Sequence, residues 1–253
     1  MTEEGAGHSA VRVFPTAALA AAAAAELVAA QVAERPRAVL GLATGGTMIP
    51  IYRRLVRLIR EGRVSLAHVT TFNLDEYVGL APSAPESYHA YMARHLFVPA
   101  GLSSAQTHLP DGTAADLTAA VRAYDEAIVR AGGIDLQLLG IGLNGHIGFN
   151  EPGTPWDTTT HVVRLADVTR RANARFFGQD PARVPARALT MGIATILRAR
   201  RILVVATGAD KAPILRRIAE SPPTVACPAT ALRQHPAVLW FLDQPAAGHL
   251  PHV

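Results

Sequence analysis

Residues 135–153 read DLQLLGIGLNGHIGFNEPG, an apolar run that passes into a glycine-rich turn. Gly140, Gly142 and Gly145 match the G-x-G-x-x-G pattern of dinucleotide-binding turns. That pattern requires a long helix after its third glycine, but residues 146–155 contain two prolines and two further glycines. The stretch therefore predicts a buried strand that ends in a sharp turn, where glycine lets the backbone approach a ligand closely. Nucleotide binding is the weaker alternative.

Short apolar runs alternate with helical patterns along the rest of the chain. Strands are expected at 11–14, 38–43, 68–73, 135–141, 202–207 and 238–242, and helices at 17–33, 48–61, 87–96, 114–131 and 211–220. Nearly continuous apolar strands separated by helices are typical of a mostly parallel sheet with helices on both faces. The sequence thus predicts a single doubly wound, Rossmann-like α/β domain over residues 1–253, with a possible mobile lid around 155–185.

The composition excludes several classes of protein. Apolar residues make up 49% and charged residues 17% of the chain, which is typical of a globular fold and not of a disordered one. The net charge of +4 is spread along the chain, so nucleic acid is not an expected partner. The alanine-rich stretch 17–30 predicts neither a membrane span nor a signal peptide, and the single cysteine, Cys227, excludes an internal disulfide. We therefore expect a cytoplasmic protein.

Polar or glycine-rich residues follow four of the expected strands. In a doubly wound sheet, ligands bind beyond the carboxyl ends of the strands, so these four segments should meet at one crevice. The segments are Thr44-Gly45-Gly46-Thr47, Asp75-Glu76-Tyr77, Asn144 to Glu151, and Gly208-Ala209-Asp210-Lys211.

Two of these segments favour a phosphate site. The turn 44–47 precedes a helix, where backbone N–H groups and the helix dipole can hold an anion. Lys211 begins another helix and is the only lysine among the 24 Lys and Arg residues, which suggests a position that needs a compact point charge. The alternatives are that the turn contains glycine for steric reasons alone, and that the chain has a single lysine by chance.

The other two segments favour acid–base chemistry. Asp75 at a strand end in an enclosed pocket is a candidate base, because desolvation raises the proton affinity of a carboxylate. His146 and Glu151 can act as a pair in which the carboxylate orients the imidazole and supports its charged form. The alternatives are that Asp75 caps a turn beside a solvated Glu76, and that His146 is structural.

These residues lie in motifs that resemble the glucosamine-6-phosphate deaminase family. The resemblance covers roughly residues 11–243, and its most specific motifs are FNLDEYVGL and GHIGFNEPG. The motifs, in the family's order, are GLATGGT (41–47), TFNLDEYVGL (71–80), ESYHAYM (86–92), GIGLNGHIGFNEPGT (140–154), TRRANARFF (169–177), ALTMGIATIL (188–197) and GADKAPIL (208–215).

The resemblance implies an enzyme that converts glucosamine 6-phosphate and water to fructose 6-phosphate and ammonia, with no metal and no cofactor. It implies that Asp75 moves the proton from C2 to C1, and that His146 opens the sugar ring with support from Glu151. Asn144 stands where many members have aspartate, which should make His146 less basic. The implied phosphate-binding residues are Thr44, Gly45, Gly46, Thr47, Arg175 and Lys211.

Two other functions stay open beside this one. The related 6-phosphogluconolactonases share the fold and a similar glycine–histidine turn, although the FNEP sequence after the histidine is not expected in them. A non-catalytic sugar-phosphate-binding protein could use the same pocket. In each case the expected ligand is a small sugar phosphate. No nucleic acid or membrane partner is expected, and the protein is a possible homo-oligomer.

Overall fold

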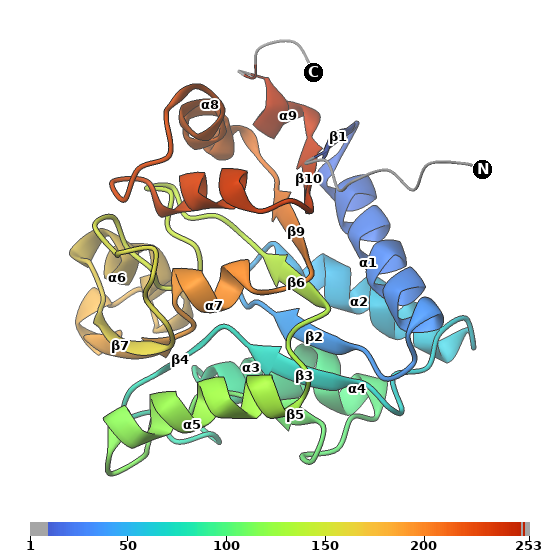
Figure 1. Ribbon diagram of the computed structural model, residues 1–253, viewed down its shortest axis with the longest axis horizontal. Coiled ribbons are helices and arrows are strands. Elements are labelled where there is room, and N and C mark those ends of the chain that lie inside the picture. Colours follow the sequence, from blue (N-terminus) through green and yellow to red (C-terminus); the bar gives the residue numbers. More distant parts are fainter. Residues whose placement is uncertain (1–9, 249, 251–253) are drawn as a thin grey trace.

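The computed structural model describes residues 10–248 and 250, so residues 1–9, 249 and 251–253 of the predicted domain lie outside the described part. A seven-stranded sheet runs through the molecule in the order β1-β10-β9-β6-β2-β3-β5, and every neighbouring pair in it is parallel (Figure 1). The predicted parallel sheet is confirmed. Its strands are β1 (Ala10–Phe14), β2 (Val39–Leu42), β3 (Thr70–Asn73), β5 (Thr107–His108), β6 (Leu136–Leu139), β9 (Arg201–Ala206) and β10 (Val238–Asp243).

Helices cover both faces of this sheet, as expected. Helices α1 (Ala17–Glu34) and α2 (Met48–Arg60) lie on one side, and α5 (Leu117–Arg130) and α7 (Ile193–Leu197) lie on the other (Figure 1). Outside residues 155–185, the other helices are α3 (Tyr88–Met92), the π-helical turn η1 (Ala93–Phe97), α4 (Val98–Ala100), η4 (Ala209–Lys211), α8 (Ala212–Glu220), η5 (Pro228–Gln234) and α9 (Gln244–Ala247). The helix expected at 87–96 is thus divided in two by a change of helical pitch.

Helix α1 is long and apolar enough to cross a membrane. The alanine-rich sequence did not lead us to expect this. Its contacts are those of a helix packed on a sheet, since it lies against α2, β1, β9 and β10. Ala20, Ala24 and Ala25 are fully buried at that contact, where small side chains allow the helix to approach closely.

The strand order places a topological switch point between β2 and β6. From β1 the chain reaches β2, β3 and β5 in one direction along the sheet, and from β6 it returns through β9 to β10. The connections that leave β2 and β6 therefore diverge to opposite faces, and a crevice opens beyond their carboxyl ends. The turn 44–47 follows β2 and the turn 140–153 follows β6.

A second, three-stranded antiparallel sheet was not expected. It consists of β4 (Asp75–Tyr77), β8 (Arg187–Thr190) and β7 (His161–Arg164), in the order β4-β8-β7. The chain bends at Leu74, so β4 leaves the direction of β3, and Met191 N donates to Leu74 O at 2.7 Å. Asp75 is thereby fixed at the junction of the two sheets, paired in register with Thr190.

Residues 155–185, the predicted lid, contain β7, helix α6 (Asp167–Asn173) and the 3₁₀ turns η2 (Ala174–Phe176) and η3 (Pro181–Arg183). They pack on a small apolar cluster separate from the main core. Leu165, Ala174, Phe177 and Val184 from this segment meet Tyr77, Phe149 and Ala188 there. Mobility of the segment stays a prediction.

Candidate active site

A pocket of about 360 Å³ lies at the switch point. All four predicted strand-end segments contribute to its wall, and α6 with the turn after it closes another side. The predicted site residues in the wall are Thr44, Gly45, Gly46, Thr47, Asp75, Asn144, His146, Arg175 and Lys211. Glu151 is the one predicted site residue outside the wall, and it lies buried behind Asn144.

The turn 44–47, Lys211 and Arg175 all line this pocket, and the charge of Arg175 acts on Lys211. Thr47 is the N-cap residue of α2 and its side chain accepts no capping hydrogen bond, while Met48 N donates to Gly45 O at 3.1 Å. Lys211 Nζ donates to Ile141 O at 2.9 Å, which holds the ammonium at the end of β6. Burial and the charge of Arg175 lower the pKa of Lys211, and Asp210 opposes them. Two cations and a helix N-terminus in the lining of one pocket are suited to a phosphate.

Asp75 lies deep in the same pocket. Its side chain is buried, and burial first and the adjacent Glu76 carboxylate second raise its pKa well above the usual range. A β-carbon built on Gly148 would lie 3.5 Å from Asp75 Oδ2, so the turn 140–153 passes directly over this carboxylate. A carboxylate with a raised proton affinity in an enclosed pocket is suited to act as a general base.

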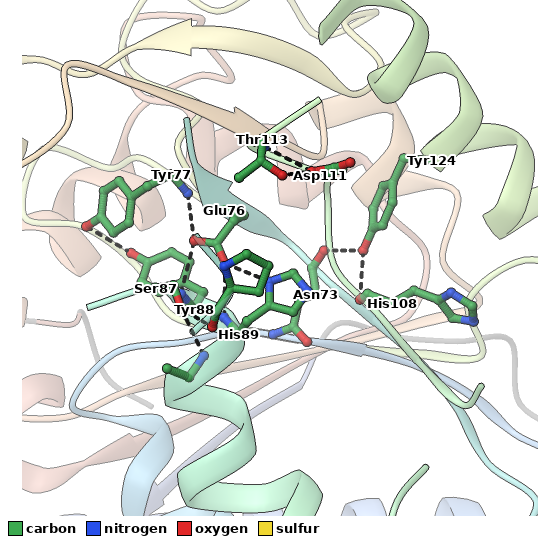
Figure 2. Close-up of polar contacts among 12 residues, drawn as sticks. Asn73, Glu76, Tyr77, Ser87, Tyr88, His89, His108, Asp111, Thr113 and Tyr124 are labelled. Carbon is green, nitrogen blue, oxygen red and sulfur yellow. Dashed lines mark hydrogen bonds and ion pairs between the residues drawn. The ribbon is translucent and has the colours of Figure 1, made fainter. Parts of the chain in front are cut away.

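Glu76 is buried, which contradicts the alternative that Asp75 caps a turn beside a solvated Glu76. Its carboxylate is buried and accepts hydrogen bonds from the backbone N–H groups of Tyr77 (2.8 Å), Tyr88 (3.0 Å) and His89 (2.9 Å) (Figure 2). It also lies 2.9 Å from His89 Nδ1. Glu76 therefore joins β4 to the start of α3 and carries Tyr88 into the pocket wall.

His146, Asn144 and Glu151 form a hydrogen-bonded relay. Asn144 Nδ2 donates to Glu151 Oε2 at 2.8 Å, and Asn144 Oδ1 lies 2.7 Å from His146 Nδ1 and accepts from His146 N at 3.2 Å. A carboxylate only accepts, so the amide must point its NH₂ group at Glu151 and its oxygen at His146. His146 Nδ1 consequently carries a proton, and Nε2 of the neutral ring is left as an acceptor.

Glu151 acts on the imidazole of His146 through this relay. Glu151 does raise the pKa of His146, but burial is the larger effect and Lys211 acts in the same direction, so the pKa of the imidazole is lowered overall. The carboxylate lies 3.8 Å from His146 Nδ1 and orients the ring through Asn144 instead of contacting it closely. The site thus favours a neutral imidazole that can accept a proton.

The turn itself shows why the glycines are present. Gly145 and Gly148 have positive φ angles of 85° and 57°, which glycine adopts without strain. No helix follows Gly145, where residues 146–153 form turns and the isolated bridge Ile147–Asn150. The segment therefore lacks the helix of a dinucleotide-binding turn, as predicted.

Within residues 10–248 and 250, no group of three His, Cys, Asp or Glu side chains is arranged to hold a metal ion. A reaction without a metal or cofactor stays a prediction.

Comparison with known proteins decides the family. The family model described as glucosamine-6-phosphate isomerases/6-phosphogluconolactonase matches residues 15–240. The chain belongs to this family. A glucosamine-6-phosphate deaminase of Rhodopirellula baltica is 50% identical over 240 residues, which cover 95% of each chain. A glucosamine-6-phosphate deaminase of Geobacillus sp. is 50% identical over 228 residues, or 90% of each chain.

Solved structures of the family agree with the observed fold. A protein described as a monomeric glucosamine-6-phosphate deaminase superimposes with a TM-score of 0.92 at 44% identity, over 94% of this chain and 99% of the other. The 6-phosphogluconolactonase of Trypanosoma brucei superimposes with a TM-score of 0.76 at 22% identity, over 98% of this chain and 100% of the other. The second likeness concerns the fold alone.

Three further residues at the site of this family member were not identified from the sequence. Thr169 of α6 donates its hydroxyl to Glu151 Oε1. Tyr88 lines the pocket and lies 3.4 Å from the hydroxyl of Tyr77. Both side chains were included in quoted motifs, ESYHAYM and TRRANARFF, but neither motif says which atom a threonine or tyrosine will contact. Glu76 is the third, and its burial next to Asp75 was the missing signal.

Proposed function

We propose that the protein is a glucosamine-6-phosphate deaminase, which converts glucosamine 6-phosphate and water to fructose 6-phosphate and ammonia. The observation that carries the proposal is the joint presence, in one pocket, of Asp75, the His146 relay and the cationic wall. The relatives that are 50% identical over 90% or more of the chain bear this name. A pocket of about 360 Å³ suits a small sugar phosphate.

The phosphate is placed at the turn 44–47, with Lys211 and Arg175 as its cations. This anchor fixes the sugar by the end remote from the reaction. Binding energy at a remote group is used to hold the reacting atoms near the catalytic side chains.

Ring opening is assigned to His146. Its neutral imidazole accepts the proton of the anomeric hydroxyl at Nε2 and returns a proton to the ring oxygen, as the bond between that oxygen and C1 breaks. The relay through Asn144 keeps Nδ1 protonated and lets Glu151 stabilise the positive charge that the ring carries between the two transfers.

Isomerisation and deamination follow at Asp75. The carboxylate removes the proton from C2 of the open-chain aldehyde while O1 gains a proton from water, which produces an enolamine. The carboxyl group then returns the first proton at C1, which leaves a protonated imine at C2. Water then hydrolyses the imine to the ketose and ammonia. The raised pKa of Asp75 lets it hold the proton between the two carbon atoms.

The second candidate is a lactonase, because solved 6-phosphogluconolactonases share the fold. Lactone hydrolysis requires no proton transfer from carbon, so it gives no function to a buried base at the position of Asp75. The two reactions are distinguished in deuterated water. The deaminase incorporates solvent deuterium at C1 of its product whenever the proton held on Asp75 exchanges with solvent before its return, and lactone hydrolysis cannot.

The direct test is ammonium release from glucosamine 6-phosphate by the purified protein. Asp75→Asn is expected to lose nearly all turnover and still bind the substrate, since the amide keeps the shape of the side chain but cannot take a proton. No ammonium from the unchanged protein would contradict the proposal. Full activity of Asp75→Asn would contradict the role of Asp75 as the base. If the protein only binds sugar phosphates, it will bind glucosamine 6-phosphate and release no ammonium.

We also propose a cytoplasmic location, because the single cysteine, Cys227, excludes an internal disulfide and so suits a reducing compartment. A homo-oligomer stays a prediction that light scattering after size-exclusion chromatography tests. The pocket described above is lined within one chain, and the solved relative at 44% identity is described as monomeric.

A further inference from the structure

Thr169 is the one buried residue of helix α6, with only 3% of its surface exposed. A threonine inside a helix commonly donates its hydroxyl to the carbonyl of a preceding turn. Thr169 instead donates to Glu151 Oε1, across 18 residues of sequence. The same residue also contributes to the pocket wall.

The two oxygens of Glu151 each have their own donor. Oε1 accepts from the Thr169 hydroxyl, and Oε2 accepts from Asn144 Nδ2 at 2.8 Å. Because Glu151 is buried, a change at one oxygen cannot be compensated by bulk water. The angle at which the carboxylate meets Asn144 is therefore set from α6.

The orientation of the His146 imidazole depends on the same hydrogen bonds. The amide of Asn144 is oriented by Glu151, and His146 is oriented by Asn144 at 2.7 Å. Helix α6 belongs to the segment 155–185, and its Asn173 donates to Tyr77 Oη at 3.0 Å as a second contact with the rest of the protein. Hydrogen bonds thus connect Thr169 of α6, through Glu151 and Asn144, to His146, which is assigned to ring opening.

We propose that Thr169 is a positioning residue for the ring-opening half of the reaction, because its hydroxyl fixes Glu151 and, through Asn144, the imidazole of His146. Ring opening then depends on α6 lying in place beside the pocket. Proton transfer by Asp75 does not, because Asp75 is held by β4 and its pairing with Thr190.

The inference rests on the proposed deaminase function and is tested with a kinetic isotope effect. Thr169→Val keeps the shape of the side chain and removes the donor. Ammonium release is measured with glucosamine 6-phosphate carrying hydrogen or deuterium at C2. We expect kcat to fall by about 10- to 100-fold, as for the loss of one buried hydrogen bond to a charged group, with a KM within about threefold of the unchanged protein.

The isotope effect on kcat/KM is the decisive measurement. Slower ring opening makes removal of the C2 proton less rate-limiting, so the effect should move toward unity in Thr169→Val. Thr169→Ser keeps the hydroxyl and should restore both rate and isotope effect. Thr169→Ala gives the same test without the bulk of valine, should Thr169→Val not fold.

Thr195→Val is the matched control. Thr195 is also buried and also donates to a carboxylate, Asp125 Oδ1 at 3.1 Å, but neither residue lines the pocket. Its kcat and isotope effect should equal those of the unchanged protein.

An unchanged rate in Thr169→Val would overturn the inference, and so would a reduced rate with an unchanged isotope effect. Absence of ammonium release by the unchanged protein would instead overturn the function on which the inference rests.

Discussion

The imidazole of His146 lies against the backbone of Gly142, and a β-carbon on residue 142 would overlap three atoms of the ring. Gly142 N also donates to His146 O at 2.9 Å, which closes the turn on itself. The glycine that matched a dinucleotide-binding pattern in the sequence therefore has another purpose. It leaves the space that the imidazole occupies.

Gly142→Ala should consequently displace His146 without unfolding the protein. The ring must move away from residue 142, and its hydrogen bond from Nδ1 to Asn144 Oδ1 is then lost. We expect kcat/KM for ammonium release to fall by about 100-fold or more, the usual contribution of a general acid–base group. Gly140→Ala is the control, since a β-carbon there would lie 3.5 Å from Met48 Cε, an ordinary contact. Equal activity of the two variants would contradict the role of Gly142.

Lys211→Glu should weaken substrate binding. It replaces a cation in the lining of the pocket by an anion, which repels the phosphate of the substrate. We expect the KM for glucosamine 6-phosphate to rise by about 100-fold or more, since loss of a charge-assisted hydrogen bond and added repulsion act together. Arg57→Glu makes the same change in net charge on the exposed face of α2 and should leave KM unchanged. An unaltered KM in Lys211→Glu would place the phosphate elsewhere.

The main sheet could be predicted from the sequence because its strands are buried on both faces. Continuous apolar runs such as 202–207 leave few alternatives, and helices between them require parallel pairing. Strands β4, β7 and β8 have only three or four residues each and mix polar with apolar side chains. They pair only because the bend at Leu74 brings β4 beside β8, which is a tertiary effect that no local pattern expresses.

The pocket could be predicted for a geometric reason. Parallel strands end at one edge, so residues after β2, β3, β6 and β9 had to lie close together. What the sequence could not supply were contacts between side chains from different connections. The placement of Asn144 between His146 and Glu151, and the hydrogen bond from Thr169, depend on how the turn and α6 pack.

Asp135→Asn should destabilise the protein and leave the reaction intact. Its buried carboxylate accepts from Arg35 Nη1 and Arg200 Nη1, both at 2.7 Å, and from Val39 N at 2.8 Å. These contacts lie at the amino ends of β2 and β6, away from the pocket. We expect a loss of about 2 kcal/mol in the free energy of unfolding by urea, because an amide cannot serve all these donors. Glu126→Gln, in an exposed pair with Arg130, should lose far less, and equal losses would contradict the prediction.

Glu76 has a different relationship to the reaction, since it acts on Asp75 through charge. The two carboxylates are neighbours in β4, and the four N–H groups around Glu76 belong to residues 77, 88 and 89 (Figure 2). These donors hold the Glu76 carboxylate in place, and burial first and the charge of Glu76 second raise the pKa of Asp75. Glu76, which is itself held in place by hydrogen bonds, thereby increases the proton affinity of the base Asp75.

Glu76→Gln should therefore shift the acid limb of the pH profile of kcat/KM to lower pH. Asp75 must be ionised to remove the C2 proton, so activity is lost as the pH falls through its pKa, and removal of the Glu76 charge lowers that pKa. Burial, the larger cause, remains and keeps the limb above that of an exposed carboxyl group. His146 titrates on the same limb, so the profile is fitted with two pKa values, of which one should move. Ser87→Ala removes the side-chain cap that accepts from Ala90 N at 3.0 Å, and so loosens the start of α3 without a change of charge. A shift in both variants would show that Glu76 acts by holding α3 and not by its charge, and an unshifted limb in Glu76→Gln would show that its charge does not set the pKa of Asp75.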